Sequence, residues 1–202
     1  MVASVEQTYL TPEEYLQLEK ASAIKHEYID GDAYAMAGAS DAHVTIAGNL
    51  FAELRSYLRG KGCRAYISDM KARIESLNRF FYPDVMVTCD QRDQETPTYK
   101  RFPKLIVEVL SESTAAFDRG DKFFDYQRLE SLQEYVLINT HVQRVECYRR
   151  AENGLWSVQF FGPTDPAFQL PSIGYKGSLA SLYEDVVFPK VDSAANQDTT
   201  QL

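Results

Sequence analysis

Two segments in the middle of the chain have the hydrophobic pattern of strands that are buried on both faces. Residues 105–110 (LIVEVL) form an apolar run that one glutamate interrupts, and residues 135–139 (YVLIN) form a second run. Such runs are typical of strands in a sheet that is covered on both sides. Between them, Ser113 or Thr114 can cap a helix that extends to about residue 130. The order strand, helix, strand predicts a β-α-β unit and therefore a parallel pair of strands.

Helices and hairpins are expected on both sides of this unit. The segment LTPEEY (residues 10–15) predicts a helix that ends near Lys20, with Thr11 as its N-cap and Glu14 completing a capping box. Residues 26–37 contain an Asp-Gly pair and predict a hairpin with a tight turn. A longer helix should begin at Ser40 or Asp41 and stop at the glycines near residue 60. Other strands are expected at residues 63–67, 71–74, 81–88, 144–150 and 155–161, and a short helix at residues 178–185.

Length and composition fit a single mixed α/β domain. The chain has 202 residues, of which 45% are hydrophobic and 25% are charged, and these are ordinary globular values. We expect one domain over residues 1–190, with a mixed central sheet flanked by helices. Residues 191–202 are polar and have no periodic pattern, so this segment is predicted to be a disordered tail.

The charge is unevenly distributed along the chain. The net charge of -8 argues against a protein that coats nucleic acid generally. Residues 59–104, however, contain ten Lys or Arg and six Asp or Glu, so this segment carries +4 and the remainder carries -12. If the segment forms one face, it can meet a polyanion. The alternative is an ordinary solvated surface.

The cysteines and the N-terminus favour a protein of the reducing cytoplasm. The three cysteines (Cys63, Cys89 and Cys147) are odd in number and include no C-x-x-C pair. We therefore expect neither a disulfide framework nor a zinc-thiolate site, with Cys89 and Cys147 as small buried hydrophobic residues. The first ten residues do not have the pattern of a signal peptide, and no apolar run is long enough to cross a membrane.

Two carboxylates occupy positions where a buried strand should have apolar side chains. Glu108 interrupts residues 105–110, and Asp84 lies in the apolar segment YPDVMV (residues 82–87). An ionised carboxylate in a dry interior costs several kcal/mol or more unless it is paired or binds a metal. If the two strands are neighbours, their carboxylates can converge on one Mg²⁺. The alternative for each residue is a structural salt bridge with Arg or Lys. Glu27, in the first hairpin, is a third candidate or else a surface strand residue.

These residues follow a spacing that resembles a nuclease motif. Pro83-Asp84 and, 24 positions after the aspartate, Glu108 are similar to the P-D…(D/E)-x-K motif of the restriction-endonuclease-like superfamily. Around the motif, the segments LTPEEY, HEYIDG (residues 26–31), VEVLSEST (residues 107–114) and EYVLI (residues 134–138) resemble the Uma-type family of bacterial restriction endonucleases. The resemblance extends over residues 10–187.

The resemblance implies a restriction-endonuclease-like fold and a nuclease that hydrolyses phosphodiester bonds of DNA. By the same resemblance, Asp84 and Glu108 are metal ligands and catalytic residues, and Glu27 is the additional acidic residue of the site. The backbone carbonyl of Val109 is a further implied ligand. The expected cofactor is Mg²⁺ or Mn²⁺, with no organic cofactor, and a homodimer is expected for a cut through both strands.

One position departs from the motif, because Leu110 stands where the motif has its lysine. Lys122 is the best substitute, since Asp118, Lys122 and Tyr126 are spaced to share one face of the helix that follows the Glu108 strand. Its alternative is an ordinary surface pair with Asp118, and Lys71 and Lys104 are rival lysines.

Other functions remain open from the sequence alone. A catalytically inactive nucleic-acid-binding or regulatory module on the same fold is the main alternative. A carboxylate-pair enzyme such as a glycoside hydrolase is a second one, which would need an open sugar cleft and no metal. His43, near the start of the second helix, is expected to reach the site, to cap the helix or to face solvent.

Overall fold

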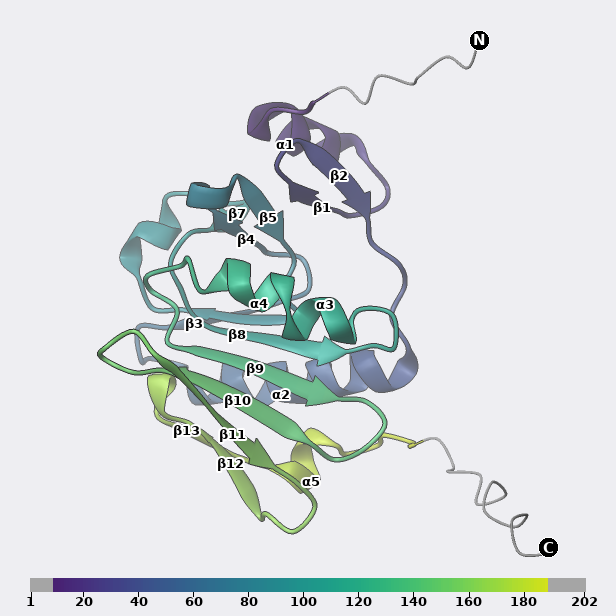
Figure 1. The fold of residues 1–202 in the computed structure, drawn as a ribbon. Helices are drawn as coiled ribbons and strands as arrows, with labels where there is room; N and C mark the ends of the chain where they lie inside the picture. Colours follow the sequence, from purple (N-terminus) through teal and green to yellow (C-terminus); the bar gives the residue numbers. More distant parts are fainter. Residues whose placement is uncertain (1–8, 189–202) are drawn as a thin grey trace, which may run out of the picture.

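A six-stranded mixed sheet forms the centre of the computed structural model, which describes residues 9–188 (Figure 1). Strands β8 (Pro103–Leu110) and β9 (Glu134–Asn139) are parallel, with Glu108 opposite Leu137, so the predicted β-α-β unit is confirmed. The other neighbours in this sheet pair antiparallel. The sheet order is β11-β10-β9-β8-β6-β3. The four strands beside β8 and β9 are β3 (Arg64–Ile67), β6 (Val85–Thr88), β10 (Val145–Arg150) and β11 (Trp156–Phe161), and β3 and β11 are the edge strands.

A second sheet of five strands lies beside the first and was not expected as a separate layer. Its order is β2-β1-β5-β4-β7, and it includes the predicted hairpin of β1 (His26–Ile29) and β2 (Asp32–Ala35). The segment 81–88 was expected to be one strand, and this is wrong. The chain leaves the second sheet after β5 (Arg79–Phe81), crosses Pro83, which has no backbone N–H to donate, and enters the first sheet as β6. The remaining strands of this sheet are β4 (Lys71–Ile74) and β7 (Tyr99–Lys100).

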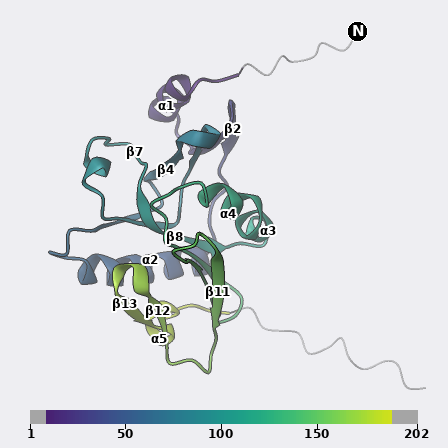
Figure 2. The ribbon, with the colours of Figure 1, turned by 60° about the vertical axis from the view of Figure 1, so that its left-hand side comes forward.

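Helices cover both faces of the six-stranded sheet, as the buried pattern of its central strands predicted. On one face, α2 (Asp41–Tyr57) packs its apolar stripe, including Leu50 and Leu54, against Val107 of β8. On the other face lie α3 (Ala115–Arg119) and α4 (Asp121–Tyr126), as Figure 2 shows. The fold also contains α1 (Pro12–Ala21), α5 (Leu179–Leu182), the unpredicted hairpin β12 (Ala167–Leu170) and β13 (Tyr175–Ser178), and three 3₁₀ turns at Glu75–Leu77, Gln91–Gln94 and Pro171–Ile173.

The helix after β8 differs from the prediction, because two short helices replace one continuous helix. Gly120 separates α3 from α4 and has backbone angles of φ -107° and ψ -104°, which are not helical. Glycine is a poor helix former and bends easily. The sequence pattern does not reveal this break, since the polar and apolar spacing continues across it.

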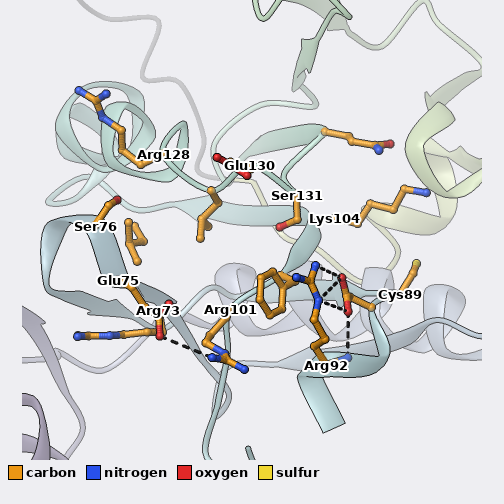
Figure 3. Close-up of a pocket in the computed structure, with 15 residues that line it drawn as sticks. Arg73, Glu75, Ser76, Cys89, Arg92, Arg101, Lys104, Arg128, Glu130 and Ser131 are labelled. Carbon is orange, nitrogen blue, oxygen red and sulfur yellow. Dashed lines mark hydrogen bonds and ion pairs between the residues drawn. The ribbon is translucent and has the colours of Figure 1, made fainter. Parts of the chain in front are cut away.

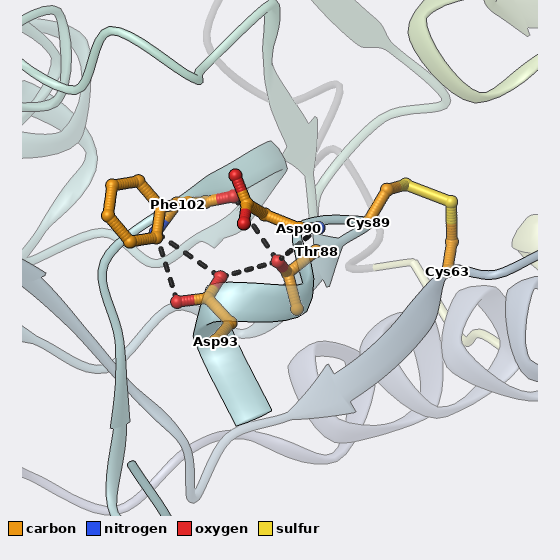
Figure 4. The surroundings of a disulfide bond; sticks show 6 residues. All are labelled: Cys63, Thr88, Cys89, Asp90, Asp93 and Phe102. Carbon is orange, nitrogen blue, oxygen red and sulfur yellow. Dashed lines mark hydrogen bonds between the residues drawn. A yellow bond between two sulfur atoms is a disulfide. The ribbon is translucent and has the colours of Figure 1, made fainter. Parts of the chain in front are cut away.

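The expectation that no disulfide forms is also wrong, because Cys63 and Cys89 are joined (Figure 4). The reason is tertiary: β3 and β6 pair antiparallel with Arg64 opposite Thr88, so the residues just outside that pair lie next to each other. Beside the disulfide, buried Asp93 accepts hydrogen bonds from the hydroxyl of Thr88 and from the backbone N–H of Phe102. Cys147 is a buried free cysteine, as expected.

Two further expectations concern the chain as a whole. The predicted tail at residues 191–202 lies outside the described residues. Within residues 9–188, none of the helices has the length and apolar character needed to span a bilayer.

Candidate active site

The strands β6 and β8 bring Asp84 and Glu108 to the same end of the sheet. Val85 lies opposite Val107, so Asp84, one residue before β6, continues this antiparallel register toward Glu108. The backbone N–H of Asp84 donates to Oε2 of Glu108 at 3.4 Å, and the N–H of Val109 donates to Oδ2 of Asp84 at 2.7 Å. Glu108 is only 3% exposed, and the residues on both sides of it in β8 are apolar residues of the core. The structure therefore brings Asp84 and Glu108 together on neighbouring chain segments.

The ammonium of Lys122 lies among three carboxylates from three different elements. Its Nζ atom is 3.0 Å from Oε1 of Glu108 on β8 and 3.1 Å from Oε1 of Glu27 on β1. The third neighbour is Asp118 on α3, at 3.6 Å. These three carboxylates, Glu27, Glu108 and Asp118, together with Asp84, which contacts Glu108, are called the carboxylate cluster below. Lys122 is thus a buried partner of Glu108 rather than a surface partner of Asp118 alone.

Tyr126 holds the carboxylate of Glu108 from one side. Its hydroxyl donates to Oε1 of Glu108 at 3.0 Å, and its ring is fully buried. The predicted shared face of Asp118, Lys122 and Tyr126 survives the break at Gly120, because both short helices pack over the same face of the sheet. Asp118 still reaches Lys122, and both Lys122 and Tyr126 contact Oε1 of Glu108.

His43 reaches Asp84, which decides among the three roles that the sequence left open. Its Nε2 atom is 3.2 Å from Oδ2 of Asp84. The helix cap is supplied by Ser40, whose hydroxyl accepts from the backbone N–H of His43. No local sequence pattern predicts this contact, because His43 at the start of α2 and Asp84 just before β6 are 41 positions apart in the chain.

Burial and charge together shift the protonation of the cluster. Burial raises the pKa of Glu108 well above the ordinary carboxyl value, although the ammonium of Lys122 opposes the rise. Burial likewise raises the pKa of Asp118. Burial lowers the pKa of Lys122, but the charges of Glu108, Glu27 and Asp118 outweigh that effect and the net pKa is raised. Lys122 therefore remains an ammonium ion.

The same balance holds for His43. Burial lowers its pKa, and the hydrogen bond and charge of Asp84 outweigh the burial, so the net pKa is raised. Asp84 thus favours an imidazolium ion beside it.

The donor set suits a hard divalent cation that completes its shell with water and substrate. Asp84 and Glu108 offer carboxylate oxygens from adjacent strands, and Glu27 offers another within the same cluster. Among residues 9–188, no group of three or more His, Cys, Asp or Glu side chains is already arranged as a metal cage. Mg²⁺ does not need one, because it is commonly held by one or two carboxylates plus waters and substrate phosphates. The residues present therefore fit such an ion.

The two rival lysines, Lys71 and Lys104, lie away from the carboxylate cluster. The amine of Lys71 lies 4.9 Å from the centre of the Tyr82 ring, and Lys104 lines a separate cavity. Neither forms an ion pair with the carboxylate cluster within the described part of the chain. Leu110, at the lysine position of the motif, is buried in the core at 3% exposure. Val109 contributes its backbone N–H to Asp84, and a role for its carbonyl oxygen stays a prediction.

Comparison with known proteins identifies the family of the chain. A family model described as "Uma2: Putative restriction endonuclease" matches residues 12–178. Two Synechocystis proteins are similar to the chain. "Uncharacterized protein slr1290" is 38% identical over 179 residues, which is 89% of this chain and 94% of the relative. "Uncharacterized protein sll1609" is 37% identical over 149 residues, which is 73% of this chain and 84% of the relative.

A solved structure has the same fold. It is a crystal structure of "a putative nuclease belonging to DUF820" from Anabaena variabilis, with a TM-score of 0.71 and 18% sequence identity. The match covers 86% of this chain and 97% of that one. The expected mixed sheet flanked by helices is therefore confirmed, and the two proteins share the same fold.

Proposed function

Because the chain belongs to the Uma2 family, whose description is "Putative restriction endonuclease", we propose that it is an endonuclease that hydrolyses phosphodiester bonds of DNA with the help of Mg²⁺ or Mn²⁺. The observation that carries the proposal is the approach of Lys122 to Glu108, at 3.0 Å, from an element outside the motif. It supplies the cation that the motif lacks at Leu110.

Lys122 and three members of the carboxylate cluster each have a chemical task in this proposal. Asp84 and Glu108, with Glu27 beside them, would hold the cation. When bound, the metal ion lowers the pKa of water and neutralises charge on the phosphate. The ammonium of Lys122 would orient the attacking water and stabilise the negative charge that develops on the phosphoryl oxygens.

Residues next to the cluster would keep these groups in place. Tyr126 fixes one oxygen of Glu108 by its hydrogen bond, and the N–H of Val109 fixes one oxygen of Asp84. The carbonyl of Val109 is a proposed further ligand. A carboxylate that is already oriented loses less freedom when it binds a cation.

A plasmid-nicking assay tests the proposal. Purified protein should convert supercoiled DNA to the open form with Mg²⁺ or Mn²⁺, and EDTA should stop the reaction. Lys122→Met should abolish cleavage, and Lys176→Met is the matched control because Lys176 is exposed on β13. Circular dichroism of both variants shows whether they are folded.

The alternative outcomes have distinct meanings. Wild-type protein that binds DNA but never cuts it, with either ion, would identify the inactive nucleic-acid-binding module instead. Cleavage by folded Lys122→Met would remove Lys122 from the mechanism. A homodimer remains our expectation for cutting both strands, and sedimentation of the protein with a DNA duplex measures it.

A further inference from the structure

A cavity opens at the end of β8 that lies away from the carboxylate cluster. It has a volume of about 650 Å³ and lies among the start of β8, the end of β4, the turn after β6 and the segment that follows α4 (Figure 3). Lys104 lines the cavity near the start of β8, and Glu108 lies toward the end of the same strand. The two residues are four positions apart, which corresponds to roughly 13 Å at the usual rise per residue. None of the four residues of the carboxylate cluster lines the cavity.

The lining is basic although the protein is acidic. Five cationic side chains and three acidic ones, Glu75, Asp90 and Glu130, line the cavity, although the net charge of the chain is -8. The cationic residues are Arg73, Arg92, Arg101, Lys104 and Arg128. All except Arg128 come from residues 59–104, so the fold gathers part of the basic segment at one cavity.

Two of these arginines have donors that no protein group satisfies. Nε of Arg101 and Nη1 of Arg73 are buried and have no hydrogen-bond partner among the described residues. The other end of Arg101 is used, because its Nη2 lies 2.8 Å from Oε2 of Glu95. Buried donors without acceptors are costly and uncommon in proteins. Both atoms are shielded from solvent, so a ligand with negatively charged oxygens would meet the positive charge of these guanidinium groups rather than these two donors.

The size of the cavity and its fork-shaped donors point to phosphate. A volume of about 650 Å³ is within the usual range for small-molecule sites. Arginine is suited to phosphate, because the guanidinium group can donate two parallel hydrogen bonds to its oxygens. The guanidinium of Arg92 is stacked 3.7 Å from the centre of the Phe102 ring, and it is also held by Asp90, so it is already oriented.

We propose that this cavity is an anion site that binds a phosphate group and that it is separate from the carboxylate cluster. The phosphate belongs to a free nucleotide or to a nucleic-acid strand, and only the second source rests on the proposed function.

Calorimetric titration of the full chain in EDTA tests the proposal with three probes: pyrophosphate, AMP and a short DNA duplex. Arg101→Gln should weaken binding by about tenfold or more, because it removes a charged donor pair. Arg128→Gln, on an exposed side chain, should weaken it without a risk to folding. Glu130→Gln should tighten binding several-fold by removing a negative charge from the rim, and a misfolded variant cannot imitate that gain.

Arg64→Gln is the matched control, because exposed Arg64 belongs to the same basic segment but does not line the cavity. Saturable binding of pyrophosphate or AMP with this pattern of variants supports a free-nucleotide source. The same pattern with the duplex alone supports a strand. Affinities that respond equally to Arg64→Gln and Arg101→Gln, or no binding of any probe, would overturn the proposal.

Lys122→Met separates this site from the proposed hydrolysis. Binding in the cavity should persist in that variant, whether or not the wild-type protein cuts DNA. Loss of cavity binding together with loss of cleavage would mean that the two sites are one.

Discussion

The ammonium of Lys122 and the carboxylate of Glu108 form a buried ion pair with Nζ 3.0 Å from Oε1. The side chains are only 7% and 4% exposed, and they come from α4 and β8. A charge in such a place depends on its partner, because removal of one member leaves the other without compensation. This pair therefore links the stability of the domain to the chemistry proposed for it.

The first prediction concerns the stability of that pair. Lys122→Met should lower the free energy of unfolding by about 3–5 kcal/mol, since Glu108 is left as an uncompensated buried acid. The double variant Lys122→Met/Glu108→Gln should recover a large part of that loss. Urea denaturation in EDTA measures both values, and the exposed Lys176→Met substitution is the control. Equal losses in the single and double variants would contradict the pairing.

The second prediction concerns pH in the same single variant. Burial raises the pKa of Glu108 and the ammonium of Lys122 opposes that rise, so removal of Lys122 should raise the pKa of Glu108 further in the folded state. A raised folded pKa contributes stability that is present at low pH and is lost as the pH rises through that raised value. The deficit of Lys122→Met relative to wild type should therefore be smaller near about pH 5 and larger near about pH 8. A deficit that shrinks with rising pH would show that Glu108 is not the group left uncompensated.

The third prediction concerns the cysteines. Native protein prepared without reductant should react with no thiol reagent at neutral pH, because burial raises the pKa of Cys147 to about 12 and Cys63 is bonded to Cys89. Denaturation without reductant should expose one thiol, and reduction should expose all three cysteines. Mass spectrometry after alkylation counts them. Three labelled cysteines in the unreduced, denatured protein would disprove the disulfide.

Removal of the disulfide gives a related fourth prediction. Cys63→Ser/Cys89→Ser should destabilise the domain by about 2–4 kcal/mol, mainly because the unfolded chain gains freedom. The double variant should still fold, since both side chains are only partly buried where they pack against the core. The melting temperature of wild-type protein with and without reductant gives an independent value, and the two losses should agree.

The fifth prediction concerns His43 and rests on the proposed metal. A cation on Asp84 would favour the neutral imidazole of His43, which would then orient Oδ2 of Asp84 as an outer partner of the ligand. His43→Gln should therefore weaken Mn²⁺ binding by about tenfold. Electron paramagnetic resonance measures free Mn²⁺ directly, so the result does not depend on cleavage. His141→Gln, an exposed histidine paired with Glu112, is the control. Unchanged affinity in His43→Gln would limit His43 to a structural contact.

The sequence by itself determined the elements whose signals are local. The capping box at Thr11 and Glu14, the Asp-Gly hairpin and the β-α-β unit all rest on neighbouring residues, and all are present in the structure. Glu108 and Asp84 were also visible, because a charge in an apolar run conflicts with burial and demands a partner. Lys122 was found by its helical spacing to Asp118 and Tyr126.

Other features depended on tertiary structure, because they are contacts between segments that no local pattern connects. The disulfide follows from the register of β3 and β6, and the contact of His43 with Asp84 follows from how α2 packs under the sheet. The break at Gly120 and the division of residues 81–88 between two sheets leave the polar and apolar pattern unchanged. The basic cavity likewise draws its arginines from four separate places in the chain. Periodicity records which face of an element is buried, and only packing decides what that face meets.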